Sequence, residues 1–265
     1  MNIVNDLRDV KRPKGTRGEV KRKRSVAEIV GITLHQTATP DFAANHKGLP
    51  QLPAHALIHR DGAISLLHHP TNVVFHGNAL NGGTIGIEVA CRAAGTEGDL
   101  RTLWISKDEK AAGKKPELLV REATDAQLAA LEELVRHYIS EIAAQGGRIR
   151  GLWAHRQGHV SRTSDPGSRI WSVAERVRVA LGLEDVRDLK LGSGKTIPPT
   201  WRIDTGQGEI AGPNATVSAK TQRGKPVAQA KPAATPKPAT KNAVKKRAAK
   251  KPAQASDAKR KATRR

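Results

Sequence analysis

The stretch GITLHQTA, residues 31–38, decides which fold this chain can adopt. Its first half holds apolar and β-branched residues, which are typical of a buried strand, and its second half is small and polar. The two halves meet at His35. We therefore expect a strand over residues 29–34 that presents His35 where the strand ends.

A second stretch, AHRQ at residues 154–157 followed by SRTSDPG at 161–167, places His155 and Asp165 ten residues apart across a turn. Such a pair can bind a metal ion, and His35 is a third candidate ligand. A catalytic zinc ion takes three nitrogen or oxygen ligands and keeps a fourth position for water, whereas structural sites close all four, usually with cysteine. The chain has a single cysteine, so the two histidines and the aspartate predict a catalytic zinc site.

The net charge of +21 lies at the two ends of the 265-residue chain. Residues 25–210 carry 21 basic and 21 acidic side chains, whereas residues 1–24 carry nine and three, and residues 211–265 sixteen and one. The last segment is rich in Lys, Ala and Pro and contains no aromatic residue, so it cannot bury a core. We predict a basic N-terminal arm (1–24), a catalytic domain (25–210) and a disordered cationic tail (211–265).

The tail and the N-terminus bear on partners and location. Clustered lysine and arginine bind anionic polymers through counterion release, so the tail is expected to contact a cell-envelope polyanion, an anionic membrane surface or nucleic acid. Residues 1–8 lack the apolar stretch of a secretory signal peptide, and no apolar run is long enough to span a bilayer. We expect synthesis in the cytoplasm, with any target outside the membrane reached by another route.

Hydrophobic patterns predict strands first and helices later. Asp61-Gly62, between two apolar runs, predicts a hairpin over residues 54–67. Residues 84–90 have the composition of a further strand. This order of elements predicts a mixed α/β fold in which a central mixed sheet is flanked by helices.

Two helices are predicted in the second half of the chain. Thr124 opens a capping box, and apolar residues then recur at helical spacing until a pair of glycines. A final helix has its apolar stripe over residues 171–181 and ends at Gly182. Between the strands and the helices, residues 91–122 are expected to form a loop insertion beside the site, with Trp104 as its large apolar residue.

With these residues assembled, the chain resembles the zinc N-acetylmuramoyl-L-alanine amidases, which are related to peptidoglycan recognition proteins and amidase-type phage lysozymes. The resemblance spans residues 28–182 and rests on four blocks in the same order. These are the strand ending at His35, the hairpin at 54–62, Gly86-Ile87-Glu88, and residues 155–167. It implies a peptidoglycan-recognition-protein-like amidase fold. It also implies cleavage of the peptidoglycan amide that joins N-acetylmuramic acid to L-alanine.

The resemblance also implies roles for single residues. His35, His155 and Asp165 would bind Zn²⁺. Glu88 would take a proton from the zinc-bound water and deliver it to the departing amine. The metal would lower the pKa of this water towards about 7 and polarise the scissile carbonyl.

One position departs from the pattern of many bacterial members, which carry a lysine two residues before the third ligand. This chain has Thr163 there, as the recognition proteins tend to, and a hydroxyl donates a weaker hydrogen bond than a cation does. Thr163 is therefore the expected second catalytic residue, unless Arg162 or His159 reaches in. The candidates for substrate binding are His55, His76 and Asn78.

Several side chains also have plainer interpretations. His35 could be a half-buried core histidine, and Glu88 an exposed strand carboxylate, although alternation places Glu88 on the face opposite its apolar neighbours. Trp153 and Trp171 are expected in the core, while Trp104 suits either packing or stacking on a sugar. The histidines expected to be solvated are His46, His59, His68, His69 and His137.

The leading interpretation is a zinc amidase that degrades the cell wall, as a phage or prophage endolysin does. One alternative is a cytoplasmic amidase that recycles muropeptides, a task that gives no reason for the cationic tail. Another is a peptidoglycan-binding recognition module without catalysis, which would be expected to lack a ligand or Glu88. A histone-like nucleic-acid binder is supported by the tail alone.

Overall fold

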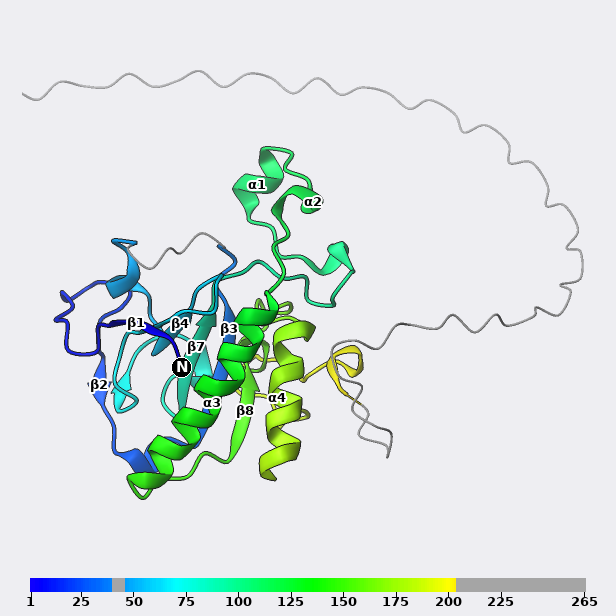
Figure 1. Cartoon of the computed structure of the whole chain (residues 1–265). Helices are drawn as coiled ribbons and strands as arrows, with labels where there is room; N and C mark the ends of the chain where they lie inside the picture. Colours follow the sequence, from blue (N-terminus) through cyan, green and yellow to red (C-terminus); the bar gives the residue numbers. More distant parts are fainter. Residues whose placement is uncertain (40–45, 204–265) are drawn as a thin grey trace, which may run out of the picture. The chain divides into compact units, whose positions relative to one another are not determined.

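The computed structural model describes residues 1–39 and 46–203, and the predicted cationic tail, residues 211–265, lies outside them. A six-stranded sheet with the order β1-β5-β4-β7-β3-β8 forms the centre (Figure 1). Its strands are β1 (Ile3–Asp6), β3 (Gly31–Gln36), β4 (Ala56–Ile58), β5 (Ile64–Leu66), β7 (Thr84–Val89) and β8 (Gly151–Ala154). Strands β3, β4, β7 and β8 run parallel, whereas β5 is antiparallel to β4, which confirms the predicted mixed sheet.

Both long helices, α3 (Asp125–Ala144) and α4 (Ser168–Leu181), lie on one face of this sheet (Figure 1). Ile32 and Leu34 of β3 belong to the core that also contains the buried side chains of both helices. Because side chains alternate along a strand, Thr33 and His35 point to the opposite face. The helices thus stabilise one face and leave the other to loops.

The predicted helices are confirmed. The hydroxyl of Thr124 accepts a hydrogen bond from the Gln127 main-chain N–H at 3.1 Å, and the Gln127 side-chain oxygen accepts one from the Thr124 N–H at 3.0 Å. Helix α4 begins earlier than its apolar stripe and ends at Gly182, which has a φ of 60°. The predicted hairpin is formed by β4 and β5, with Gly62 in its turn at a φ of 85°.

The structure also contains elements that the pattern did not predict. Strand β1 pairs in parallel with β5, so the N-terminal arm begins on the sheet. Strand β8 extends the other edge, and β2 (Arg22–Lys23) forms an antiparallel ribbon with β6 (Asn72–Val73). The insertion at 91–122 holds two short helices, α1 (Lys107–Ala111) and α2 (Pro116–Leu119). Single 3₁₀ turns lie at Val26–Glu28, Leu49–Gln51, Asn78–Leu80, Leu100–Thr102, His155–Gln157 and Pro199–Trp201.

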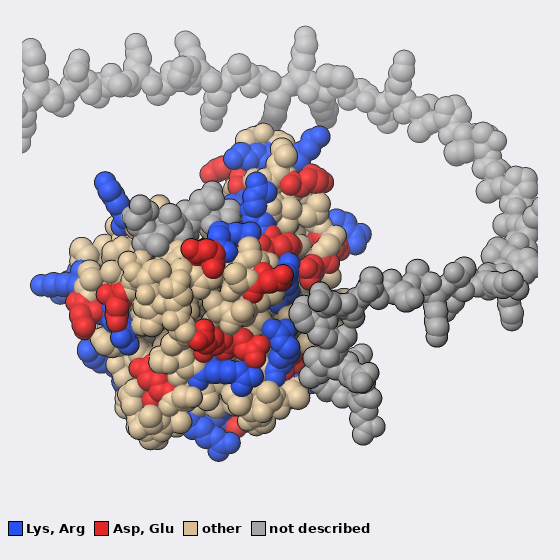
Figure 2. Space-filling model, viewed as in Figure 1, with Lys and Arg blue, Asp and Glu red and all other residues tan. Residues whose placement is uncertain are grey.

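The surface of the described residues is mixed in charge. Figure 2 shows basic and acidic side chains interspersed over the face in view, in keeping with the balanced composition of residues 25–210. The segment after α4 returns to the core, where Ile197 and Trp201 are buried. Within residues 1–39 and 46–203, no helix combines the length and apolar composition needed to cross a membrane.

Candidate metal centre and active site

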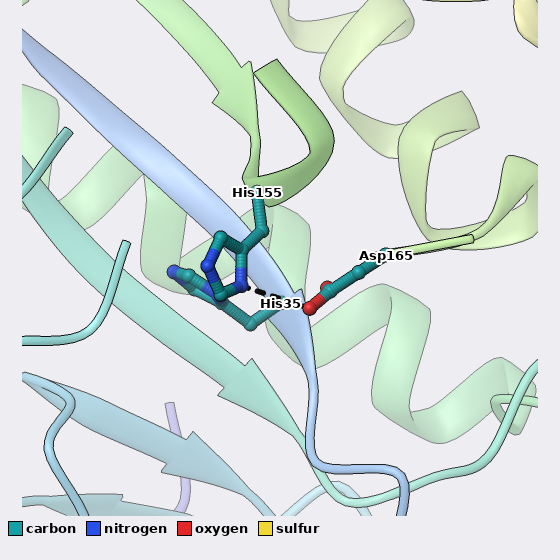
Figure 3. Close-up of side chains that lie close together, drawn as sticks. All are labelled: His35, His155 and Asp165. Carbon is teal, nitrogen blue, oxygen red and sulfur yellow. Dashed lines mark hydrogen bonds and ion pairs between the residues drawn. The ribbon is translucent and has the colours of Figure 1, made fainter. Parts of the chain in front are cut away.

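Two parallel strands and one loop bring the three predicted ligands together. His35 is near the end of β3, and His155 directly follows β8, with Leu34 paired to Ala154 in register. The carboxyl ends of parallel neighbours meet at one edge of a sheet, which places the two histidines side by side. Asp165 enters from the loop before α4 (Figure 3).

The ligand atoms converge on one point. The Nδ1 atoms of His35 and His155 are 2.8 Å apart, and His155 Nδ1 is 2.9 Å from Asp165 Oδ2. One donor atom from each residue lies within 4.8 Å of the others, and all three residues are buried. The pKa of His35 lies well below its usual value, mainly because the ring is buried and also because other histidines lie beside it. A neutral imidazole is the form that binds a metal.

The outer ring nitrogens have partners that fix which nitrogen carries the proton. His76 Nε2 donates to the Thr84 carbonyl at 3.2 Å, so His76 Nδ1 accepts from His35 Nε2 at 3.0 Å. His155 Nε2 donates to Asn78 Oδ1 at 2.9 Å. In the neutral tautomers compatible with these contacts, both ligand histidines turn an unprotonated Nδ1 towards the carboxylate of Asp165. Three acceptors that face each other repel unless a cation lies between them, so the residues present fit a zinc ion.

Removing the oxygen that holds His155 is expected to weaken zinc binding. Asn78 has a φ of 58°, a conformation that glycine and asparagine tolerate, so Asn78→Gly removes the acceptor without straining the backbone. We expect a zinc affinity about 10- to 100-fold lower, measured by competition with a chelator. Asn78→Asp keeps an acceptor and should retain most of the affinity. Equal affinities of Asn78→Gly and the wild type would contradict this role.

Two residues that the sequence analysis did not identify hold the candidate ligands, or the segments next to them, through hydrogen bonds. Gln36 donates its main-chain N–H to Asp165 Oδ1 at 3.0 Å and its side-chain amide to the Ser164 carbonyl at 2.8 Å. The buried Arg24 donates to the carbonyls of Pro70, Asn81, Gly82 and Thr84, and so holds the segment that carries His76 and Asn78. Gln36 could have been suspected because it directly follows His35, whereas no sequence feature pointed to Arg24.

Glu88 lies beside the ligands. It is paired in register with His35 on the adjacent strand β7, so both side chains occupy the same face. Its oxygen Oε2 is buried and makes no hydrogen bond within the described part of the chain. Burial, with a further contribution from the negative charge of Asp165, raises the pKa of Glu88 to about 8. The carboxyl group lines a hollow of about 350 Å³ together with His76, Asn78, His155 and Asp165.

The metal-free protein is expected to lose stability as the pH rises, because of Glu88. The pKa of this carboxyl is near 4.5 in an unfolded chain and about 8 in the fold. Between these values the folded state holds a proton that the unfolded chain has released, so the free energy of unfolding falls from about pH 4.5 to about pH 8. Glu88→Gln lacks this slope, and the two proteins should diverge by about 3 to 4 kcal/mol between pH 5 and pH 8.

Urea unfolding in chelator at pH 5 and pH 8 measures this difference, because all other titrating groups are common to both proteins. Adding zinc should flatten the wild-type slope. Parallel pH profiles for the two proteins would show that Glu88 does not titrate as its burial requires.

The structure places two of the predicted site residues away from the hollow of Glu88. His55 is fully buried, accepts from the Gly86 N–H at 2.9 Å and donates to the Asn72 carbonyl at 2.9 Å, so it supports the loops. Thr163 is exposed and lines a neighbouring hollow with Trp201, not the hollow of Glu88. The structure places Arg162, one residue earlier, on the hollow of Glu88 instead.

The remaining histidines and tryptophans divide between core and surface. His59 and His68 are buried rather than solvated. Trp171 and Trp153 are buried as predicted, with 1% and 9% of their surface exposed. Trp104 is 45% exposed and lies on the rim of two hollows, so its predicted role in sugar stacking stays a prediction.

Two imidazoles and a carboxylate that could hold a metal ion lie next to Glu88, whose buried Oε2 has no hydrogen-bond partner among the described residues. The sequence model of the N-acetylmuramoyl-L-alanine amidase family matches residues 25–168, more than half of the chain, and the chain belongs to this family. No curated protein sequence matches it significantly.

A comparison with solved structures found several similar proteins. The N-acetylmuramoyl-L-alanine amidase LysC from Clostridium intestinale is 15% identical, with a TM-score of 0.44 over 69% of this chain and 99% of that one. AmpDh3 from Pseudomonas aeruginosa is 19% identical, with a TM-score of 0.41 over 65% of each chain. A mutant form of the Drosophila recognition protein PGRP-LB, in complex with tracheal cytotoxin, is 17% identical, with a TM-score of 0.38 over 64% of this chain and 90% of that one.

Proposed function

We propose that this protein is a zinc-dependent hydrolase that cleaves the amide between N-acetylmuramic acid and L-alanine in peptidoglycan. The observation that carries the proposal is the convergence of His35, His155 and Asp165 beside Glu88, a carboxylate whose buried oxygen has no partner in the described structure. Membership of the amidase family supports the choice of bond. A recognition module that only binds would have no use for this glutamate.

The residues divide the chemistry among them. Zinc held by the two histidines and Asp165 would lower the pKa of a bound water towards about 7 and polarise the scissile carbonyl. Glu88 takes a proton from the attacking water and passes it to the departing amine. For this the carboxyl must be ionised, and its pKa falls when positive charge occupies the ligands in front of it. His76 and Asn78 keep the ligand histidines in the required protonation state and orientation.

The cellular task and the partners of the charged ends are part of the proposal. We propose that the protein degrades the cell wall, as an endolysin does, after release from the cytoplasm by a separate route. Residues 211–265, with sixteen basic and one acidic side chain, would hold it to an anionic polymer of the envelope. Clustered cations bind any such polymer, so the charge supports the class of partner and not a particular one.

Digestion of purified sacculi tests this function. The wild type should release peptides with a free N-terminal L-alanine, and release should stop on treatment with a chelator and resume on addition of zinc. Binding to sacculi without any release would mean that the protein is a recognition module. Cleavage only of small soluble muropeptides would favour the recycling amidase.

A further inference from the structure

Two arginines border the hollow over Glu88 from different parts of the chain. Arg17 belongs to the N-terminal arm, and Arg162 to the loop that carries Asp165. Both line the hollow of Glu88, and both also line the adjoining hollow that extends to Trp104. A molecule bound across the candidate metal ligands would therefore lie beside both arginines.

These two arginines differ from their neighbours in their ion pairing within the described part of the chain. Within residues 1–39 and 46–203, neither guanidinium group forms an ion pair with a carboxylate. Arg92, on the same wall, differs: it contacts Glu109 at 2.7 Å and donates to the Ala38 carbonyl at 2.7 Å. The positive charges of Arg17 and Arg162 both act to lower the pKa of Glu88, which agrees with their position at this hollow.

The main chain around Arg17 is fixed in advance. Arg12 donates to the carbonyls of Pro50 at 3.1 Å and Leu67 at 2.6 Å. Gly18 packs so closely that a Cβ atom there would lie 2.5 Å from the Pro50 carbonyl oxygen. Lys21 donates its main-chain N–H to the Val73 carbonyl at 2.8 Å. Because these contacts place the main chain of Arg17 beside the site before a substrate arrives, binding would lose little main-chain conformational entropy there.

We propose that Arg17 and Arg162 bind a carboxylate on the peptide portion of the substrate; this rests on the proposed function. A guanidinium group pairs with a carboxylate through two parallel hydrogen bonds. The lactyl carboxyl of the sugar is consumed in the scissile amide, so the carboxylates of the substrate lie in its peptide. Arg17 lies outside residues 25–168, the part that matches the family, so this contact comes from the arm of this chain.

Paired substrates separate this contact from catalysis. One is a synthetic muramoyl peptide with free carboxylates, and the other carries the same peptide with its carboxylates converted to carboxamides. The wild type should prefer the acidic form. Arg17→Ala should lower kcat/KM about tenfold more for the acidic form than for the amidated form, and this difference should lie mainly in KM. Arg162→Ala should show the same selectivity, and high salt should reduce the preference of the wild type.

Two control variants remove a positive charge elsewhere. Lys14→Ala lies on the same arm but lines neither hollow, and Arg148→Ala lies before β8, at the end of the sheet away from the ligands. Both should keep the preference for the acidic substrate. If either control lost the preference, overall charge would explain the preference, and the proposed role of Arg17 and Arg162 would be overturned.

The outcomes distinguish this inference from the proposed function. If Arg17→Ala lost kcat/KM equally on both substrates, or on neither, the proposed carboxylate contact would be overturned. The proposed amidase function would be unaffected. If the wild type cleaves neither substrate, the proposed function fails. In that case, calorimetry of the acidic peptide tests the carboxylate contact alone. Binding to Arg17→Ala about tenfold weaker than to the wild type would support the contact, and equal binding would refute it.

Discussion

Replacing Glu88 by glutamine is expected to lower the rate of amide hydrolysis by about a thousandfold while leaving zinc binding intact. Glutamine has the same shape as glutamate but cannot take a proton from water. It is not one of the three converging ligands, so the metal site should persist. Release of N-terminal L-alanine from sacculi gives the rate, and metal analysis of the purified variant gives the zinc content.

Glu122→Gln is the matched control for this change. Glu122 is also a partly buried carboxyl whose pKa is raised by burial, but it accepts a hydrogen bond from the Ala94 N–H and does not line the hollow of Glu88. Its variant should hydrolyse at the wild-type rate. Near-normal activity of Glu88→Gln with a full complement of zinc would exclude Glu88 as the proton carrier.

Loss of the metal is the second large effect that we expect. At a zinc concentration one hundred times its dissociation constant, binding adds about 2.7 kcal/mol to the free energy of unfolding. Asp165→Asn should remove most of this gain together with the activity, because a neutral amide is a poor replacement for a carboxylate ligand. The asparagine oxygen still accepts from the Gln36 N–H, so the loop keeps its shape. Urea unfolding with and without zinc measures the gain.

Asp108→Asn serves as the control, since Asp108 is an exposed carboxylate on α1. It should show the full zinc-dependent gain. A full gain in Asp165→Asn as well would mean that the ion binds elsewhere or does without this ligand.

The ligands of the candidate site were predictable because their positions depend on simple rules. His35 follows an apolar run, and a side chain at the end of a strand lies at the sheet edge where loops meet. The partner strand β8 was not predicted, since its four residues are too few for a periodic signal. Strand β1 was missed because its residues are largely exposed and two of its four are Asn and Asp, which are depleted in strands.

The differences between the predicted and the observed positions of site residues lie in loops. A shift of one residue exchanges Thr163 for Arg162 at the hollow, and only the path of the loop decides which of them faces Glu88. His55 and His76 look alike in sequence, yet among the described residues His55 bonds to main-chain groups and Arg24, whereas His76 bonds to the candidate ligand His35. Such differences depend on contacts between distant segments, which a local pattern does not contain.

The placement of both long helices on one face of the sheet separates two kinds of evolutionary constraint. Substitutions under α3 and α4 change the free energy of unfolding but do not touch the reacting groups, because alternation directs those side chains away from Glu88. Substitutions in the loops over the other face reshape the substrate surface without repacking the helices. The same scaffold can therefore acquire new specificities, and an arm such as the one that carries Arg17 is a means of doing so.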